Sequence, residues 1–244
     1  MNGMHKKVRT SGRNRFAVLA ALASTGTLLV VALATPADAS TSGPVMSGRA
    51  YGVGLSNTRV LGVPVADSAS PDTGVVSSAT STDTTAGCTN LPAGLVTATL
   101  LCSSVSIDGG RYNSYAEESV ASAHIGIPGL PVIDALGLEA DSFTGCRTGL
   151  DGTVGSDGAS VIGFLRVGHT VLINTPTVVP PNTRYTVGAL SVTLNEQVET
   201  PGLLNGGLTV NAIHVQVNAP GVATADVVIS SATSSVANCY PYVS

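Results

Sequence analysis

Three histidines, His124, His169 and His214, are the residues in this sequence whose type and spacing first suggest chemistry. They are equally spaced along the chain, and each lies in or beside a stretch of strand-like sequence. Three imidazoles can hold a catalytic zinc ion that keeps one position open for water. Equal spacing in sequence does not bring residues together in space, however. We therefore predict no metal or other cofactor site and treat the three histidines as unrelated strand residues.

Serine is abundant, so a Ser-His-Asp nucleophile is a second hypothesis. The Gly-x-Ser-x-Gly turn that exposes such a serine between a strand and a helix is missing, and residues 155–158 (GSDG) form a plain turn sequence. The Asp151-Gly152 and Asp157-Gly158 pairs offer oxygen ligands for calcium, but the spaced acidic set of an EF-hand is absent. We predict no catalytic residues and interpret both Asp-Gly pairs as ordinary turns.

Carboxylates occur in two groups, Glu117-Glu118 and Glu139 with Asp141, which raises the hypothesis of a glycosidase pair. Within a strand, adjacent residues point to opposite faces, so Glu117 and Glu118 are not expected to act together. A glycosidase pair made of carboxylates from two different strands therefore stays an open hypothesis. The chain has no Trp and only 4% aromatic residues, which disfavours a surface for stacking sugars.

The cysteines, Cys88, Cys102, Cys146 and Cys239, are four in number and include no Cys-x-x-Cys pair. An even count in an exported chain indicates disulfides, whereas zinc sites usually carry close cysteine pairs. Three pairings are possible. We favour a Cys88–Cys102 bond, because these residues are close in sequence and flank a stretch typical of a β-hairpin. Cys146 and Cys239 then form the second bond.

Residues 1–39 have the pattern of a secretory signal peptide. A basic front is followed by an apolar, uncharged run from Phe16 to Ala34, and Ala37-Asp38-Ala39 matches a cleavage site, so we expect cleavage between Ala39 and Ser40. The alternative is a retained membrane anchor, for which the run is long enough. No later run is long enough to span a bilayer. The protein is thus predicted to be secreted, either free or loosely bound to the cell wall.

Cleavage makes the chain strongly acidic. The full sequence has a formal net charge of −4, and loss of the leader leaves six arginines, no lysine and fourteen acidic residues, a net charge near −8. Nucleic acids and anionic lipid headgroups attract clustered positive charge. We therefore predict that the protein does not bind nucleic acid. We interpret its acidic residues as a solvated surface that keeps the protein soluble.

The clearest structural pattern is the stretch 207–217, where apolar residues occupy every second position. The alternation changes phase between Ala212 and Ile213, which predicts a β-bulge there. A second strand pattern over residues 225–229 follows a Pro220-Gly221 turn. We predict that the rest of the mature chain consists of strands packed on this pair.

Short strand patterns separated by Gly, Pro and Asn turns continue through the mature chain, and they predict an all-β fold. An antiparallel β-sandwich stapled by disulfides is favoured over a β-solenoid, because no fixed repeat is present. We expect a flexible segment over 40–48 and one domain over 49–244. Within the domain we expect loops over 82–92 and 151–158 and one helical turn over 132–136. The expected strands are 49–56, 60–65, 75–82, 94–107, 112–127, 136–146, a long strand or bent hairpin over 159–173, and two strands over 183–199.

Three of these stretches carry a family resemblance: residues 190–197 (LSVTLNEQ), 207–215 (GLTVNAIHV) and 225–232 (ADVVISSA), with the Pro180-Pro181-Asn182 turn before them. In this order and spacing they resemble the actinobacterial choice-of-anchor P family of secreted surface proteins, over about residues 159–239. The resemblance implies export and a β-rich body, but no activity. No anchor pattern is found before Ser244, which implies free secretion or non-covalent retention.

These observations predict a secreted, non-enzymatic protein of the cell envelope or extracellular space with a structural or interaction role. An extracellular hydrolase of unknown substrate is the alternative. Cell-wall or homotypic protein contacts are the expected partners.

Overall fold

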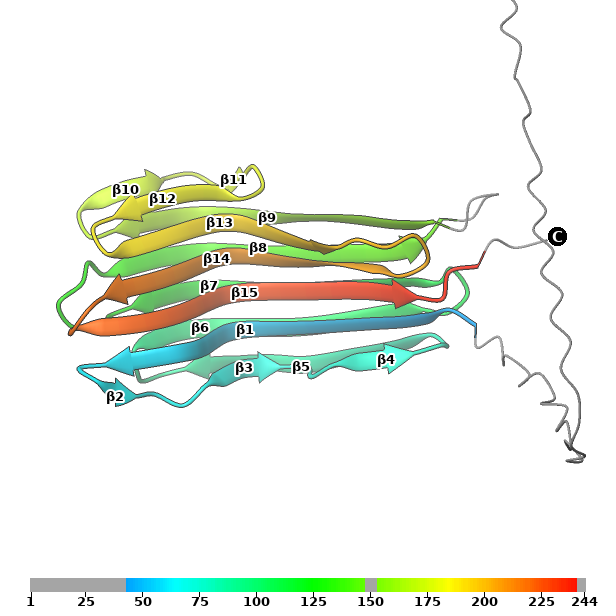
Figure 1. Cartoon of the computed structure of the whole chain (residues 1–244), viewed down its shortest axis with the longest axis horizontal. Coiled ribbons are helices and arrows are strands. Elements are labelled where there is room, and N and C mark those ends of the chain that lie inside the picture. The colour runs from blue at the N-terminus through cyan, green and yellow to red at the C-terminus, as the bar shows by residue number, and fades with distance from the viewer. Residues whose placement is uncertain (1–42, 148–152, 241–244) are drawn as a thin grey trace, which may run out of the picture. The chain divides into compact units, whose positions relative to one another are not determined.

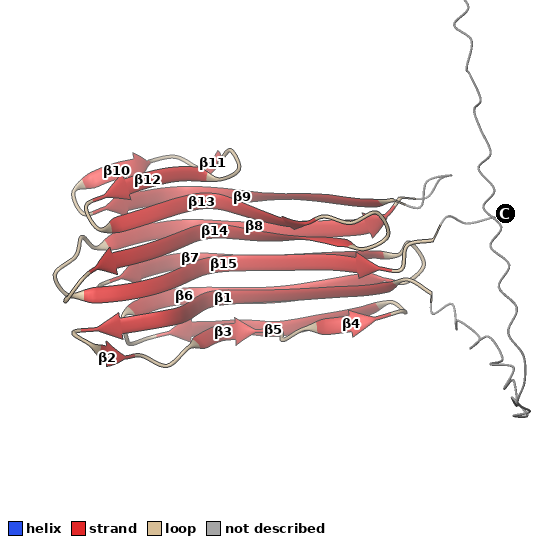
Figure 2. Cartoon of the chain, in the orientation of Figure 1, coloured by secondary structure: helices blue, strands red, loops and turns tan. Residues whose placement is uncertain are grey.

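The computed structural model describes residues 43–147 and 153–240, and all of its regular elements are strands (Figure 2). The all-β prediction is confirmed. The helical turn expected over 132–136 is wrong, because strand β8 begins at Ile133 and pairs on both sides. The signal peptide over 1–39 and its Ala39–Ser40 cleavage position lie outside the described residues.

Two antiparallel sheets face each other (Figure 1). Sheet A has the order β12 (Thr183–Val187), β13 (Leu190–Thr200), β14 (Gly206–Ala219), β15 (Ala223–Ala237) and β1 (Val45–Val60), and the short strands β2 (Val63–Pro64), β3 (Ser68–Asp72) and β4 (Val76–Ser78) pair with the outer edge of β1. Sheet B has the order β10 (Thr170–Ile173), β9 (Val154–Val167), β8 (Ile133–Cys146), β7 (Asn113–Ile125), β6 (Val96–Asp108) and β5 (Thr82–Leu91), and β11 (Thr177–Val178) also pairs with β9. This arrangement is the β-sandwich, and not the solenoid.

Several sequence-based boundaries need correction. β1 already begins at Val45, within the segment expected to be flexible over 40–48, since residues 45–48 pair with the end of β15. The loop expected over 82–92 is strand β5, whose polar residues are tolerated at a sheet edge. β9 begins at Val154, inside the loop expected over 151–158, and the region 159–173 is a hairpin of β9 and β10.

The phase change between Ala212 and Ile213 is real, but the predicted bulge is wrong. Residues of β14 on both sides of the change are buried, while the pairing of β14 with β13 and β15 continues without a register shift. The neighbouring strands change phase at the same level. Asn195 in β13 and Ser230 in β15 both have positive φ and lie on either side of Ala212, and Ser230 also lies opposite Gly52 of β1.

Sheet B has the same feature. Leu100 in β6 and Gly137 in β8 have positive φ, and they lie opposite Ala121 of β7 and Gly163 of β9. The alternation of inward and outward residues therefore changes phase in eight long strands: β1, β13, β14 and β15 of sheet A, and β6, β7, β8 and β9 of sheet B. The positions of change form one line across each sheet, which we call the phase line. Because neighbouring strands shift together, the hydrogen-bonded ladders stay in register.

Between the phase line and the β6–β7 turn, buried hydroxyl groups lie among the apolar side chains that fill the space between the sheets. Ser142 and Thr144 of β8 each lie 2.7 Å from Ser234 Oγ of β15, and Ser142 Oγ also donates to the Leu208 carbonyl oxygen at 2.8 Å. These buried hydroxyls link sheet B to sheet A. A hydroxyl that is buried with a partner avoids the penalty of an unmade hydrogen bond, so this polar interior is compatible with stability.

The cysteines form the two pairs favoured from their spacing. Cys88–Cys102 joins directly opposite residues of β5 and β6, and Cys146–Cys239 joins the end of β8 to the segment after β15. The second bond thus connects sheet B with sheet A. It closes a separation of 93 residues, against 14 for the first, so in the chain-entropy account it restricts the unfolded chain more.

Gly52 lies on the phase line, where the sheets approach closely. A methyl group added there would lie 2.4 Å from Leu101 Cδ2 and 2.9 Å from Glu118 Oε1. We expect Gly52→Ala to lower the free energy of unfolding by about 1–3 kcal/mol, the usual range for overpacking a core. Gly43→Ala is the matched control, since nothing lies within 4 Å of its added methyl. Urea denaturation of both variants measures the difference, and equal midpoints would show that the sheets can separate there.

Candidate functional site

The three histidines do not meet. His124 lies on the outer face of sheet B, His214 lies on the outer face of sheet A, and His169 lies in the turn between β9 and β10. The hypothesis of a three-histidine metal site is therefore wrong. Within residues 43–147 and 153–240, no three His, Cys, Asp or Glu side chains are arranged to hold a metal ion.

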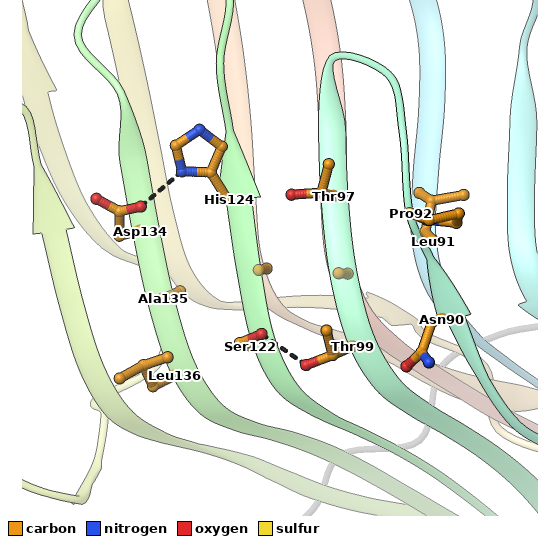
Figure 3. A pocket seen from close by; sticks show the side chains of 12 residues that line it. Asn90, Leu91, Pro92, Thr97, Thr99, Ser122, His124, Asp134, Ala135 and Leu136 are labelled. Atoms are coloured by element: carbon orange, nitrogen blue, oxygen red, sulfur yellow. Dashed lines mark hydrogen bonds and ion pairs between the residues drawn. The ribbon is translucent and has the colours of Figure 1, made fainter.

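A hollow of about 510 Å³ lies on the outer face of sheet B, across β5 to β8 (Figure 3). Its floor carries polar side chains of β6, β7 and β8, and Leu91 with Pro92 stands on one side of it, while Leu136 stands on the other. The polar residues that line it are Asn90, Thr97, Thr99, Ser122, His124 and Asp134.

Ser122, His124 and Asp134 have the residue types of a nucleophilic triad but not its geometry. His124 Nδ1 lies 2.7 Å from Asp134 Oδ1, as a triad requires. The other ring nitrogen, Nε2, lies beside Gly126 and points away from Ser122, whose hydroxyl is 2.6 Å from Thr99 Oγ1 (Figure 3). Since no base contacts the Ser122 hydroxyl, a triad is not assembled in this arrangement, and the side chains present hydrogen-bonding groups to the hollow.

Asp134 is bound from two sides. Arg166 of β9 reaches its Oδ2 with Nη2 at 2.6 Å, and His124 contacts its Oδ1. The hydrogen bond from Arg166, and then that from His124, lowers the pKa of Asp134 against a smaller opposing effect of burial. The carboxylate therefore stays ionised and holds the His124 ring in place at the edge of the hollow.

The carboxylates of β7 and β8 follow the expected alternation. Glu117 faces outward, where it pairs directly with Asp141 across the strands, and Glu118 points into the core. Burial, and then the charge of nearby Glu139, raises the pKa of Asp141. Burial together with the Glu117 charge raises the pKa of Tyr115 to about 12.

Of the two Asp-Gly pairs, the structure describes only Asp157-Gly158, which lies in strand β9 and not in the expected turn. Asp157 Oδ1 accepts a hydrogen bond from the Gly158 amide at 3.0 Å, within strand β9. Asp151-Gly152 lies outside the described residues.

Glu118, which the sequence marked only as a neighbour of Glu117 in a possible carboxylate pair, is fully buried. Ser103 Oγ of β6 donates a hydrogen bond to Oε2, while Oε1 has no hydrogen-bond partner among the described residues. Burial raises the pKa of Glu118 to about 8, against the lowering effect of the Ser103 hydrogen bond. At neutral pH the group is therefore mainly a neutral acid.

This raised pKa makes stability depend on pH. Between the unfolded value near 4.5 and the folded value of about 8, the native state holds a proton that the unfolded chain has released. The free energy of unfolding should thus fall as the pH rises across this window, by a few kcal/mol at about 1.4 kcal/mol per pKa unit. Glu118→Gln, which stays neutral, should lose this slope. Urea titrations from pH 5 to pH 9 test it, and parallel curves for both proteins would contradict the assignment.

A second polar cluster lies on the outer face of sheet A. His214 Nε2 of β14 lies 2.5 Å from Asp226 Oδ1 of β15, and its Nδ1 lies 2.8 Å from Glu196 Oε2 of β13. Asn211 Nδ2 donates to the same Glu196 oxygen at 2.7 Å. Contact with Glu196, and then with Asp226, raises the pKa of His214, whereas burial lowers it. Because a carboxylate of a neighbouring strand lies against each ring nitrogen, this cluster fastens three strands together.

The same cluster predicts a second pH effect. The raised pKa of His214 means that its contribution to stability is complete below the unfolded value of 6.5 and is lost as the pH rises through the folded value. His214→Gln should therefore destabilise the protein by roughly 1.5–3 kcal/mol at pH 6, the range for hydrogen bonds to charged groups, and by less at pH 9. Thermal unfolding at both pH values measures the difference. An effect of His214→Gln that grows toward alkaline pH would be inconsistent with the charged contact.

Comparison of the chain with protein-family models, with curated proteins and with solved structures gives no match. Over the residues that the structure describes, no helix has the length and apolar character needed to cross a membrane.

Proposed function

We propose that this protein is an exported β-sandwich that acts by contact at the cell envelope or in the extracellular space, and not by catalysis. One observation carries the proposal: the hollow on sheet B exposes hydrogen-bonding groups, yet its Ser122 hydroxyl is bonded to Thr99 and its His124 ring is bonded to Asp134. Such a surface recognises a ligand or a partner without reacting with it.

Export is supported by two independent features. Disulfides persist mainly in oxidising compartments, and the two bonds here staple both the edge of sheet B and the junction between the sheets. The leader pattern over residues 1–39 supports the same location. The resemblance of residues 190–232 to the choice-of-anchor P family supports a place at the bacterial surface or in the surrounding medium.

An extracellular hydrolase is the second candidate, because the His124–Asp134 contact is the orienting half of a triad. It would require the imidazole to leave Gly126 and reach Ser122, which in turn would have to release Thr99.

A serine-directed fluorophosphonate probe separates the two candidates. We expect Ser122 to stay unlabelled, because no base lowers the barrier to its attack, and we expect hydrolysis of p-nitrophenyl acetate to be the same for the native protein and for Ser122→Ala. A denatured sample serves as the control for non-specific labelling. Selective labelling of Ser122 in the folded protein, lost in His124→Ala, would establish the hydrolase instead.

A further inference from the structure

The two ends of the sandwich differ in chemistry. At the end that Figure 1 shows on the left, the turns between strands contain only apolar residues, glycine, proline and His169. These turns span residues 61–62, 92–95, 126–132, 168–169, 188–189 and 220–222. Surface turns are normally rich in Asn, Asp and Ser, whose side chains hydrogen-bond the turn backbone. None of these residues, and no Arg, Lys or Glu, occurs in these turns.

The opposite end has ordinary polar turns. Thr80 and Ser81 lie between β4 and β5, Arg111 lies between β6 and β7, Arg147 follows β8, and Asn205 precedes β14. The two ends share the same core and the same solvent. Ile127 and Leu130 of the apolar end pack on this core, so only the exposed apolar side chains of these turns have no role in the fold of the single chain.

Four aliphatic side chains are exposed at the apolar end: Leu61 at 70%, Val63 at 64%, and Val132 and Val222 at 36% each. We call these four residues the apolar cap. Their turns are in contact, since the Leu61 amide donates to the Val222 carbonyl oxygen at 2.8 Å, and a methyl group added at Gly129 would lie 3.5 Å from Val222 Cγ1. The turns that carry Leu61, Val132 and Val222 are therefore neighbours at one end of the molecule.

Leu61 is the residue at the cap that local folding favours least. It forms a two-residue turn with Gly62 between the paired residues Val60 and Val63, and both turn residues have positive φ, 50° and 80°. Asn-Gly is the preferred sequence for such a turn, and a bulky residue in this left-handed conformation costs about 1–2 kcal/mol. Leucine at this position thus adds conformational strain as well as exposed apolar area to the isolated chain.

We propose that the apolar cap is a self-association surface, through which a second copy of this chain binds end to end about a two-fold axis. In such a contact the same patch serves both partners, so an apolar patch is complementary to itself. Depletion of charged residues at the centre marks interface cores. A polar rim is supplied by Arg59, which lines one hollow with Gly62 and Val222, and by the charged pair of Arg166 and Asp134 behind the tips. This inference does not depend on the contact function proposed above, because an enzyme could dimerise in the same way.

A lipid bilayer fits the cap less well. Protein segments that lie in a bilayer interface combine apolar side chains with Trp, Tyr, Lys or Arg anchors, and these turns contain none of them. A patch of four aliphatic residues covers on the order of a few hundred Å², less than the roughly 800 Å² per partner of a standard interface. The dimer is therefore expected to be weak and to depend on concentration.

Sedimentation velocity of the secreted protein, measured up to about 1 mM chain, tests the proposal. We expect the sedimentation coefficient to rise with concentration toward that of a dimer. The variant Leu61→Asn/Val222→Asn should weaken association at least tenfold while its thermal midpoint stays equal or rises, because asparagine suits the turn at residue 61. Leu203→Asn is the matched control, since Leu203 is 71% exposed at the polar end, and it should associate like the native protein.

Two outcomes would overturn the proposal. The first is a native protein that stays monomeric over the whole range, and the second is equal loss of association in Leu203→Asn. Vesicles of phosphatidylcholine identify the competing occupant: a monomeric protein that pellets with them, and fails to do so after Leu61→Asn/Val222→Asn, would assign the cap to lipid.

Discussion

The fold depends on one constraint: two sheets must stay hydrogen-bonded and packed while all eight long strands exchange their faces along the phase line. A strand that changed phase alone would need a bulge, which would shift its register against both neighbours. Here alternate strands carry a residue of positive φ, namely Asn195 and Ser230 in sheet A and Leu100 and Gly137 in sheet B, and their neighbours change with them. The ladders remain continuous across the line, so no strand can be altered there independently of the others.

The two halves of the interior meet at the phase line. Beyond the line, toward the β6–β7 turn, buried serine and threonine hydroxyls lie among apolar side chains, and contacts such as Ser142–Ser234 link the sheets. Glu118 lies at this junction, with Ser103 on its carboxyl group and with Ser230 Oγ donating to its backbone oxygen at 2.9 Å. A buried carboxyl without a cationic partner is stable only when neutral, so the place where the two halves of the core meet is also the place most sensitive to proton release.

Much of the fold could be predicted from the sequence, because local alternation reports which face of a strand is buried. The hairpin of β12 and β13, the strand β14 with its change of phase, and the two disulfide pairs all follow from residue pattern and spacing. β5 was missed because an edge strand needs no apolar alternation, and its residues are mostly exposed. The origin of the phase change was missed because it lies in neighbouring strands: no feature of β14 alone shows that Asn195 and Ser230 adopt positive φ.

The polar clusters were harder to predict than the strands, for a related physical reason. His214 meets Glu196 and Asp226 only through the registers of β13, β14 and β15, and His124 meets Asp134 only through that of β7 and β8. In both clusters the carboxylate partners of each histidine come from adjacent strands, and these contacts fasten the sheet. In the turns of the apolar end, Ile127 and Leu130 pack on the core. The exposed side chains of Leu61, Val132 and Val222 belong to neither the ladders nor the core, so these positions are free to serve contacts outside the chain.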